Sequence, residues 1–188
     1  MESIGRQGTG RNTMIIETER LQLRQMTQED LPALAAILQD KVAMFAYEHA
    51  FSDEETQAWL DRMTERYRND GYGLWAVLLK SSGEMIGQCG LTKQKVEEKD
   101  VLEIGYLFQR KYWKQGFAIE AAKACKTYAF ETLHADEVYS IVRDNNLGSM
   151  NVAIRNGMTI RCRFIKHYYG IDMPHYAFSI RKEEYFSE

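Results

Sequence analysis

One strand–helix–strand unit restricts the fold of this chain more than any other feature of its sequence. Residues 101–108, "VLEIGYLF", are typical of a buried strand, and residues 136–142, "DEVYSIV", are typical of another. Between them a helical pattern runs to about Leu133. Because two strands joined through a helix pair in parallel, the sequence predicts one parallel pair with a right-handed crossover.

The remaining expected strands mostly follow one another directly, which favours antiparallel pairing. Possible capping boxes at Thr27/Asp30 and Ser52/Glu55 mark the starts of two early helices. A last short helix is expected over 145–157. The expected strands lie within 14–26, at 73–80 and 84–94, and in a final hairpin around 170–172. The sequence therefore predicts an α/β fold with one mixed, mostly antiparallel sheet of about seven strands and about four helices.

Composition excludes several classes of protein. The 188 residues are 45% hydrophobic and 27% charged with a formal net charge of −3, an ordinary balance for one globular domain. No Lys/Arg-rich run supports a nucleic-acid partner, and no apolar stretch is long enough to span a membrane. Three scattered cysteines and four histidines without a metal-ligand spacing predict reduced thiols, no metal and a cytoplasmic location.

The first residues are polar and contain glycine. We interpret 1–13 as a flexible leader or a cloning remnant, because the segment lacks the apolar core of a signal peptide. Residues 14–188 contain no linker that separates two units. We therefore expect a single domain over 14–188.

A basic loop with one glycine stands where the crossover helix begins. Arg110, Lys111 and Lys114 precede Gly116. The first turn of a helix has unpaired N–H groups and partial positive charge, and a glycine lets a ligand approach the backbone. The loop fits a diphosphate site, although a solvated connection with one glycine explains the same residues. It is neither a Walker loop nor a three-glycine dinucleotide fingerprint.

Two further places carry candidate chemistry. Asn146 and Ser149 lie one turn apart on the last expected helix. They are either a helix cap and an ordinary helix serine, or two residues that contact a ligand. Glu103 interrupts an apolar strand, where a carboxylate is costly unless it has a partner or a function. Facing a pocket, Glu103 would be a base with a raised pKa, and on a solvated face it would be ordinary. The strand pattern does not decide between the two.

In this order and spacing, the motifs resemble those of the GNAT superfamily of acyl-CoA-dependent N-acetyltransferases, in particular the RimJ/RimL-like ribosomal-protein N-terminal acetyltransferases. The superfamily's pyrophosphate loop, Q/R-x-x-G-x-G/A, corresponds to "WKQGFA" at 113–118, with Trp113 at the first position and Lys114 where a second glycine is common. The resemblance covers nearly the whole chain. It implies a V-shaped splay between the strands at 101–108 and 136–142, which holds the pantetheine arm of acetyl-CoA.

The resemblance also assigns roles to residues. It implies Glu103 as the base and Ser149 as the acid that protonates the departing thiolate, while the tyrosine that many members carry is replaced by Ala153. A backbone N–H around Leu107 or Phe108 would meet the thioester oxygen. The remaining acetyl-CoA contacts would come from Arg110, Lys111, Lys114, Gln115, Gly116, Phe117, Ala118, Asn146 and Ser149.

The expected activity is direct transfer of an acetyl group from acetyl-CoA to a primary amine in a ternary complex. Alternatives are a non-catalytic acyl-CoA sensor and, more weakly, a nucleotide-binding α/β protein. The acceptor, expected between residues 28–70 and the last hairpin, is a protein N-terminus, a polyamine or an antibiotic-like amine. Acidic residues such as Glu48 would attract a cationic amine there, unless they belong to a solvated loop. The sequence leaves open a monomer or a homodimer.

Overall fold

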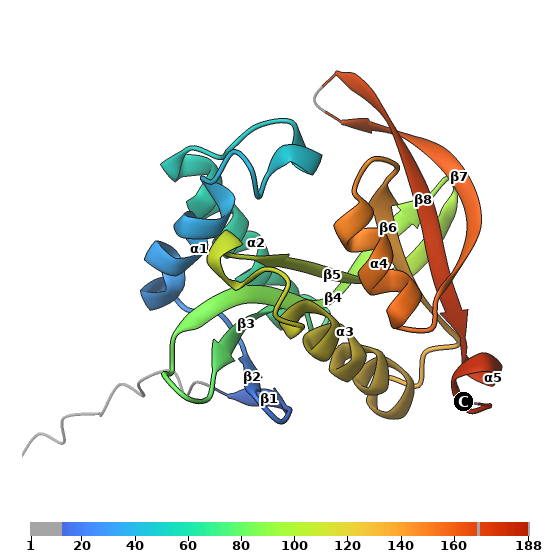
Figure 1. The fold of residues 1–188 in the computed structure, drawn as a ribbon, viewed down its shortest axis with the longest axis horizontal. Helices are drawn as coiled ribbons and strands as arrows, with labels where there is room; N and C mark the ends of the chain where they lie inside the picture. Colours follow the sequence, from blue (N-terminus) through green and yellow to red (C-terminus); the bar gives the residue numbers. More distant parts are fainter. Residues whose placement is uncertain (1–12, 169, 188) are drawn as a thin grey trace, which may run out of the picture.

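The structure is a computed structural model that describes residues 13–168 and 170–187. One sheet of eight strands runs through the molecule in the order β1-β2-β3-β4-β5-β6-β8-β7 (Figure 1). The predicted leader at 1–13 falls almost wholly outside the described residues. The strands are β1 (Met14–Glu17), β2 (Leu21–Arg24), β3 (Leu74–Leu79), β4 (Met85–Val96), β5 (Lys99–Phe108), β6 (Glu137–Arg143), β7 (Thr159–Tyr168) and β8 (Ile171–Arg181).

Strand pairing confirms the mixed sheet. Strands β5 and β6 pair in parallel, and the other six neighbouring pairs are antiparallel. The eighth strand arises because residues 14–26, expected to hold one strand, form the β1–β2 hairpin. Most of residues 95–101 extend β4 and β5, so that the turn between these strands consists of Glu97 and Glu98.

Over the part of the chain that the structure describes, five α-helices accompany the sheet, one more than expected. They are α1 (Leu31–Leu38), α2 (Asp53–Asn69), α3 (Phe117–Thr127), α4 (Leu147–Arg155) and the short α5 (Lys182–Tyr185). The two predicted capping boxes both form, one ahead of a 3₁₀ turn that leads into α1 and one at Ser52 on α2. After α3 the chain continues as a π-helical turn, Tyr128–Thr132, to the expected end near Leu133. None of the helices described has the length and apolar character needed to span a bilayer.

Helices cover both faces of the sheet. On β4, Gln88 accepts a hydrogen bond from Trp59 Nε1 of α2 at 2.9 Å, while the next residue, Cys89, contacts Cys125 of α3. Because successive side chains of a strand point to opposite faces, α2 and α3 lie on opposite sides of the sheet. In Figure 1, α3 and α4 lie on the near side. The core between these layers holds Trp75, fully buried and edge-on to Tyr128.

The parallel pair is short, and this determines where a ligand can enter the sheet. Strands β5 and β6 are in register only at Glu103 and Tyr139, and Ser140 Oγ then donates to Ile104 O at 3.2 Å. Beyond that contact, the strands diverge toward their carboxyl ends (Figure 1). A pocket lined by residues of both strands lies there. The sheet therefore splays between β5 and β6, as expected.

Candidate active site

The splay opens into a pocket of about 610 Å³. Its walls come from β5, β6, α2, the start of α4, the 3₁₀ turn Phe45–Tyr47 and the final hairpin. Four of the candidate residues line it: Glu103, Leu107, Asn146 and Ser149. The segments from which an acceptor site was expected, residues 28–70 and the last hairpin, also contribute to its walls.

Glu103 faces this pocket from β5. Its Oε1 accepts a hydrogen bond from Ile141 N–H at 3.3 Å, and its Oε2 accepts one from Thr92 Oγ1 at 3.4 Å. Burial raises the pKa of the Glu103 carboxyl above its ordinary value, although Lys166, these two donors and Arg66 act in the opposite direction. The strand pattern left the orientation of Glu103 open, and the structure turns it toward α2 and the pocket.

Backbone geometry distinguishes Leu107 from Phe108. Gln109 N–H donates to Ile86 O of β4 at 3.0 Å, and successive N–H groups of a strand point to opposite edges. The N–H of Leu107 therefore points toward β4, whereas the N–H of Phe108 points toward the gap between β5 and β6. The Phe108 carbonyl faces the same way and accepts Trp113 Nε1 at 2.8 Å. Of the two candidate donors, Phe108 directs its N–H toward the gap.

The start of α4 lies against the same gap. Asn146 is the N-cap of α4, and its Oδ1 accepts Ser149 N–H at 3.1 Å. Tyr106, on β5, also lines the pocket and donates its hydroxyl to Ser149 O at 2.9 Å. Burial raises the pKa of the Tyr106 phenol, so the hydroxyl keeps its proton at neutral pH. The expected acid position thus contains a tyrosine beside the serine, supplied by a strand.

The loop before α3 has the backbone of an anion site. Gly116 is the N-cap of α3 with φ of 83°, and Lys114 is also left-handed with φ of 61°. Only glycine adopts such a conformation without strain, which accounts for Gly116. The first N–H groups of the helix, from Phe117 and Ala118 onward, have no partner within the helix. Their dipoles point out at the helix end, where they favour an anion.

Two of the three cations expected at this loop are paired with acids, and a further cation, Arg20, contacts the loop. Arg110 is paired with Asp40 at 2.7 Å and Lys111 with Glu84 at 2.6 Å, so both charges are compensated by acids. Lys114 is exposed beside Gly116. Arg20, from the β1–β2 turn, donates to Gln115 O at 3.1 Å and stacks on the ring of Phe117 at 4.4 Å.

Side chains far apart in the sequence form the other end of the pocket. Tyr47 packs edge-on against Trp59 of α2 and Tyr168 of β7, with ring centroids 6.1 and 6.3 Å apart. Glu48, the expected attractor of a cationic amine, forms an ion pair with Arg143. Burial lowers the pKa of His175, whose Nδ1–H donates to Met173 O at 2.9 Å, so this ring is neutral at neutral pH. Among the described residues that line the pocket, Glu103 is therefore the only acid.

Several residues of the site gave no signal in the sequence. Thr92 and Tyr106 are ordinary strand residues, and Arg20 lies in a turn nearly a hundred positions from the loop that it contacts. Arg66 and Lys166 stand on an amphipathic helix and a terminal hairpin, where cations are common. Within residues 13–168 and 170–187, no group of three or more His, Cys, Asp or Glu side chains is placed to hold a metal ion.

Comparison with known proteins identifies the fold and its family. Residues 20–159, most of the chain, match the family model described as an acetyltransferase (GNAT) domain. The chain belongs to the GNAT acetyltransferases. It is an acetyl-CoA-dependent N-acetyltransferase, as the resemblance of its sequence predicted.

Individual GNAT relatives agree over most of their length. An uncharacterised Bacillus subtilis protein, YkkB, is 33% identical over 142 residues, which are 75% of this chain and 83% of that one. A GNAT-family acetyltransferase from Bacillus anthracis superposes with a TM-score of 0.76 at 25% identity, covering 90% of this chain and 99% of that one. The ribosomal-protein-S5-alanine acetyltransferase of Vibrio fischeri has the same fold, with a TM-score of 0.72 at 16% identity over 89% and 96% of the two chains.

Proposed function

We propose that this GNAT protein transfers the acetyl group of acetyl-CoA directly to a primary amine of a protein N-terminus or a small molecule in a ternary complex. The observation that carries the proposal is the pocket in which Glu103 faces Asn146 and Ser149 across the splay of β5 and β6. A base and a thioester channel that meet in one pocket are what direct transfer requires.

The acetyl-CoA site extends from the start of α3 into the splay. The backbone of Gln115, Gly116, Phe117 and Ala118 binds the pyrophosphate, supported by the left-handed Gly116 and the unpaired N–H groups of the helix. Lys114 supplies the nearby positive charge, because Arg110, Lys111 and Arg20 already pair with Asp40, Glu84 and Glu120. The pantetheine arm runs between β5 and β6, where Asn146 offers its side-chain amide.

The reaction begins with the removal of a proton from the acceptor ammonium. A protonated amine is not a nucleophile, and a carboxylate with a raised pKa is a better base than an ordinary glutamate. Glu103 has this character, either in contact with the amine or through a water. The neutral nitrogen then attacks the thioester carbon, forming the C–N bond and placing negative charge on the carbonyl oxygen.

Donors on β5 and α4 complete the transfer. The Phe108 N–H, directed into the gap, stabilises the oxyanion. As the C–S bond breaks, the thiolate takes a proton from Ser149 or from Tyr106, both of which line the pocket. CoA thiol and the acetylated amine are the products.

The cysteines support direct transfer rather than an acyl-cysteine intermediate. Cys89 and Cys125 are buried and face each other at 3.6 Å, and burial raises the pKa of the Cys125 thiol. A buried thiol with a raised pKa is a poor nucleophile. Cys162 does not line the pocket. The cysteines are all free thiols, which also agrees with the predicted cytoplasmic location.

The alternative function is an acyl-CoA sensor that binds but does not turn over. Ala153 stands in place of the tyrosine that many members use as the acid, which favours a sensor, but Tyr106 beside Ser149 weakens that reason. The RimJ/RimL-like assignment remains a proposal, supported by the shared fold with the Vibrio fischeri enzyme. Amine-dependent release of CoA separates the enzyme from the sensor.

Acetyl-CoA binding is tested by Gly116→Glu, with Gly71→Glu as the matched control. Both glycines are left-handed, with φ of 83° and 80°, so the backbone strain is alike, but Gly71 has no neighbour within 4 Å of an added Cβ and lies away from the pocket. Calorimetry with acetyl-CoA is expected to show a loss of about 100-fold or more for Gly116→Glu and none for Gly71→Glu. Unchanged affinity of Gly116→Glu would refute the pyrophosphate assignment.

A further inference from the structure

The acceptor end of the pocket has an uneven distribution of charge. Its lining contains four cations, Arg62, Arg66, Arg143 and Lys166, against the single carboxyl of Glu103. Arg143 is compensated by Glu48. The structure gives Arg62, Arg66 and Lys166 no ion-pair partner among the residues that it describes. Three cations and one carboxyl therefore face the space where an amine must bind.

Two different elements bring these cations together. Arg62 and Arg66 stand one turn apart on α2, on the same face as Trp59, whose ring lies 5.4 Å from the Arg62 guanidinium. Lys166 reaches the pocket from β7. Arg66 on α2 and Lys166 on β7 line the same pocket as Glu103, and the charge of each lowers the pKa of that carboxyl. The fold brings these cations together, because the helix and the hairpin that carry them are a hundred residues apart in the sequence.

A cluster of this kind favours anionic acceptors over polycationic ones. A second ammonium on the acceptor would meet like charges, while an oxyanion would replace lost hydration with charge-assisted hydrogen bonds. Guanidinium groups match the geometry of carboxylates and phosphates. The same positive field disfavours the protonated form of the reacting amine, which helps to generate the neutral nucleophile.

Resting on the proposed function, we infer that the acceptor is a small amine that also carries an oxyanion, a carboxylate or a phosphate, held by Arg62, Arg66 and Lys166 while Glu103 takes the proton of its amino group. This assignment disfavours polyamines and polycationic antibiotic amines. Glu103 keeps the role of base that the proposed function gives it and does not act as an attractor of positive charge.

A panel of matched amines tests the assignment on the full chain with saturating acetyl-CoA. The pairs are L-glutamate with L-glutamine, O-phosphoethanolamine with ethanolamine, and the tripeptide amides Asp-Ala-Ala and Asn-Ala-Ala, with spermidine as the polycation. The first pair probes a carboxylate, the second a phosphate and the third an acidic peptide N-terminus. CoA release is expected to show kcat/KM about 10-fold or more higher for the anionic member of at least one pair.

A binding measurement keeps the inference separate from the proposed function. The dissociation constant of each probe is measured by calorimetry on the CoA-saturated protein, which needs no turnover. Tighter binding of an anionic probe without any transfer would support the inference and refute the enzyme mechanism. Equal or weaker binding of every anionic probe, or a preference for spermidine, would overturn the inference even if acetyl transfer occurs.

Charge reversal identifies the residues responsible. Arg66→Glu and Lys166→Glu are each expected to abolish the preference for the anionic member of the pair, while the KM for acetyl-CoA is unchanged. Arg68→Glu is the control, because Arg68 is an exposed cation on the same helix that does not line the pocket. If the preference for the anionic member persists in both Arg66→Glu and Lys166→Glu, or if Arg68→Glu abolishes it equally, these side chains do not bind the anionic group of the acceptor.

Discussion

Two glutamates at the junction of β5 and β6 illustrate how partners decide what a carboxylate does. Glu103 stands on β5, and Glu137 stands on β6 two residues before Tyr139, the register partner of Glu103. Both are largely surrounded by protein, and burial alone would raise the pKa of each. Their pKa values nevertheless shift in opposite directions.

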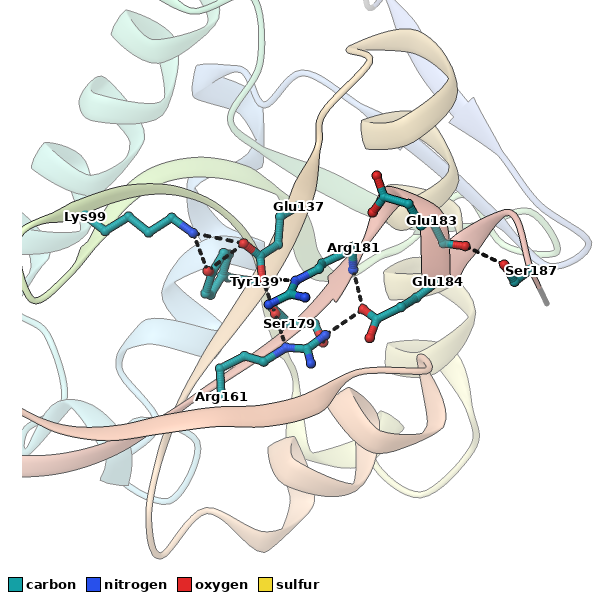
Figure 2. A network of polar contacts seen from close by, with 9 residues as sticks. All are labelled: Lys99, Glu137, Tyr139, Arg161, Ser179, Arg181, Glu183, Glu184 and Ser187. Atoms are coloured by element: carbon teal, nitrogen blue, oxygen red, sulfur yellow. Dashed lines mark hydrogen bonds and ion pairs between the residues drawn. The ribbon is translucent and has the colours of Figure 1, made fainter.

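Glu137 is held in a dense polar network (Figure 2). Its Oε1 accepts Ser179 Oγ at 2.6 Å, and its Oε2 accepts Tyr139 OH at 2.8 Å and Lys99 Nζ at 2.9 Å. These bonds outweigh the burial and lower the pKa of Glu137. Glu103 has only two long hydrogen bonds, with Thr92 and Ile141, and burial prevails. Glu137 therefore has the surroundings of an ionised structural group, whereas Glu103 has those expected of the proposed base.

The largest effect is expected when Glu103 loses its ability to accept a proton. Glu103→Gln keeps the shape of the side chain but removes the base, so kcat should fall by about 10²–10⁴-fold while acetyl-CoA affinity is unchanged. Because the raised pKa means that folding disfavours the charged form, the variant should melt no lower than the wild type at neutral pH. A steady-state assay and a thermal melt measure both. Unchanged kcat would remove Glu103 from the mechanism.

An effect of intermediate size, on stability and not on catalysis, is expected at Glu137. Glu137→Gln weakens three charge-assisted hydrogen bonds, so the free energy of unfolding should fall by about 1–2 kcal/mol, a figure reduced for the partial exposure of Lys99. The value of kcat should stay within about 2-fold. Urea unfolding and the same transfer assay provide the measurements.

The pH dependence of stability provides a second measurement on Glu137→Gln. Because the pKa of Glu137 is lower in the folded state, its stabilising contribution is fully present above the unfolded-state pKa and is lost as the pH falls through the folded value. The stability difference between wild type and Glu137→Gln should therefore shrink in acid. A difference that is constant with pH, or a large loss of kcat, would contradict the structural role.

The smallest effect is expected from one hydrogen bond. Thr92→Val removes a donor that lowers the pKa of Glu103, so the acidic limb of the pH profile of kcat/KM should move upward by about half a unit. Ser179→Ala removes a donor to Glu137 and should leave that limb where it is. Movement of the limb in Ser179→Ala but not in Thr92→Val would reverse the two roles.

The fold was predictable where the signals were local. The strand–helix–strand unit fixed the parallel pair, and Ser52 with Glu55 marked the start of α2. The β1–β2 hairpin was missed because its turn contains neither glycine nor proline. That turn is stabilised from outside, since Glu120 of α3 accepts Thr18 Oγ1 at 2.6 Å and Arg20 N–H at 2.9 Å. A contact between residues about a hundred positions apart cannot be recognised from a local sequence pattern.

The backbone features of the candidate site could be predicted from the sequence, but the pairing of its charged side chains could not. The glycine at the start of α3 and the cap of α4 follow from helix chemistry alone. The sequence does not show that Arg110 and Lys111 are taken by Asp40 and Glu84. Nor does period-2 alternation show which face of the sheet Glu103 occupies, because a polar side chain suits either a pocket or a solvated face.

The most direct test of the central claim is the pH profile of kcat/KM for the wild type, Glu103→Gln and Glu137→Gln, measured with the best acceptor of the panel. The wild type and Glu137→Gln should share an acidic limb at a pH above the ordinary range of a glutamate, and this limb should be absent from the residual activity of Glu103→Gln. If the limb persists in Glu103→Gln, or is lost in Glu137→Gln, another group is the base.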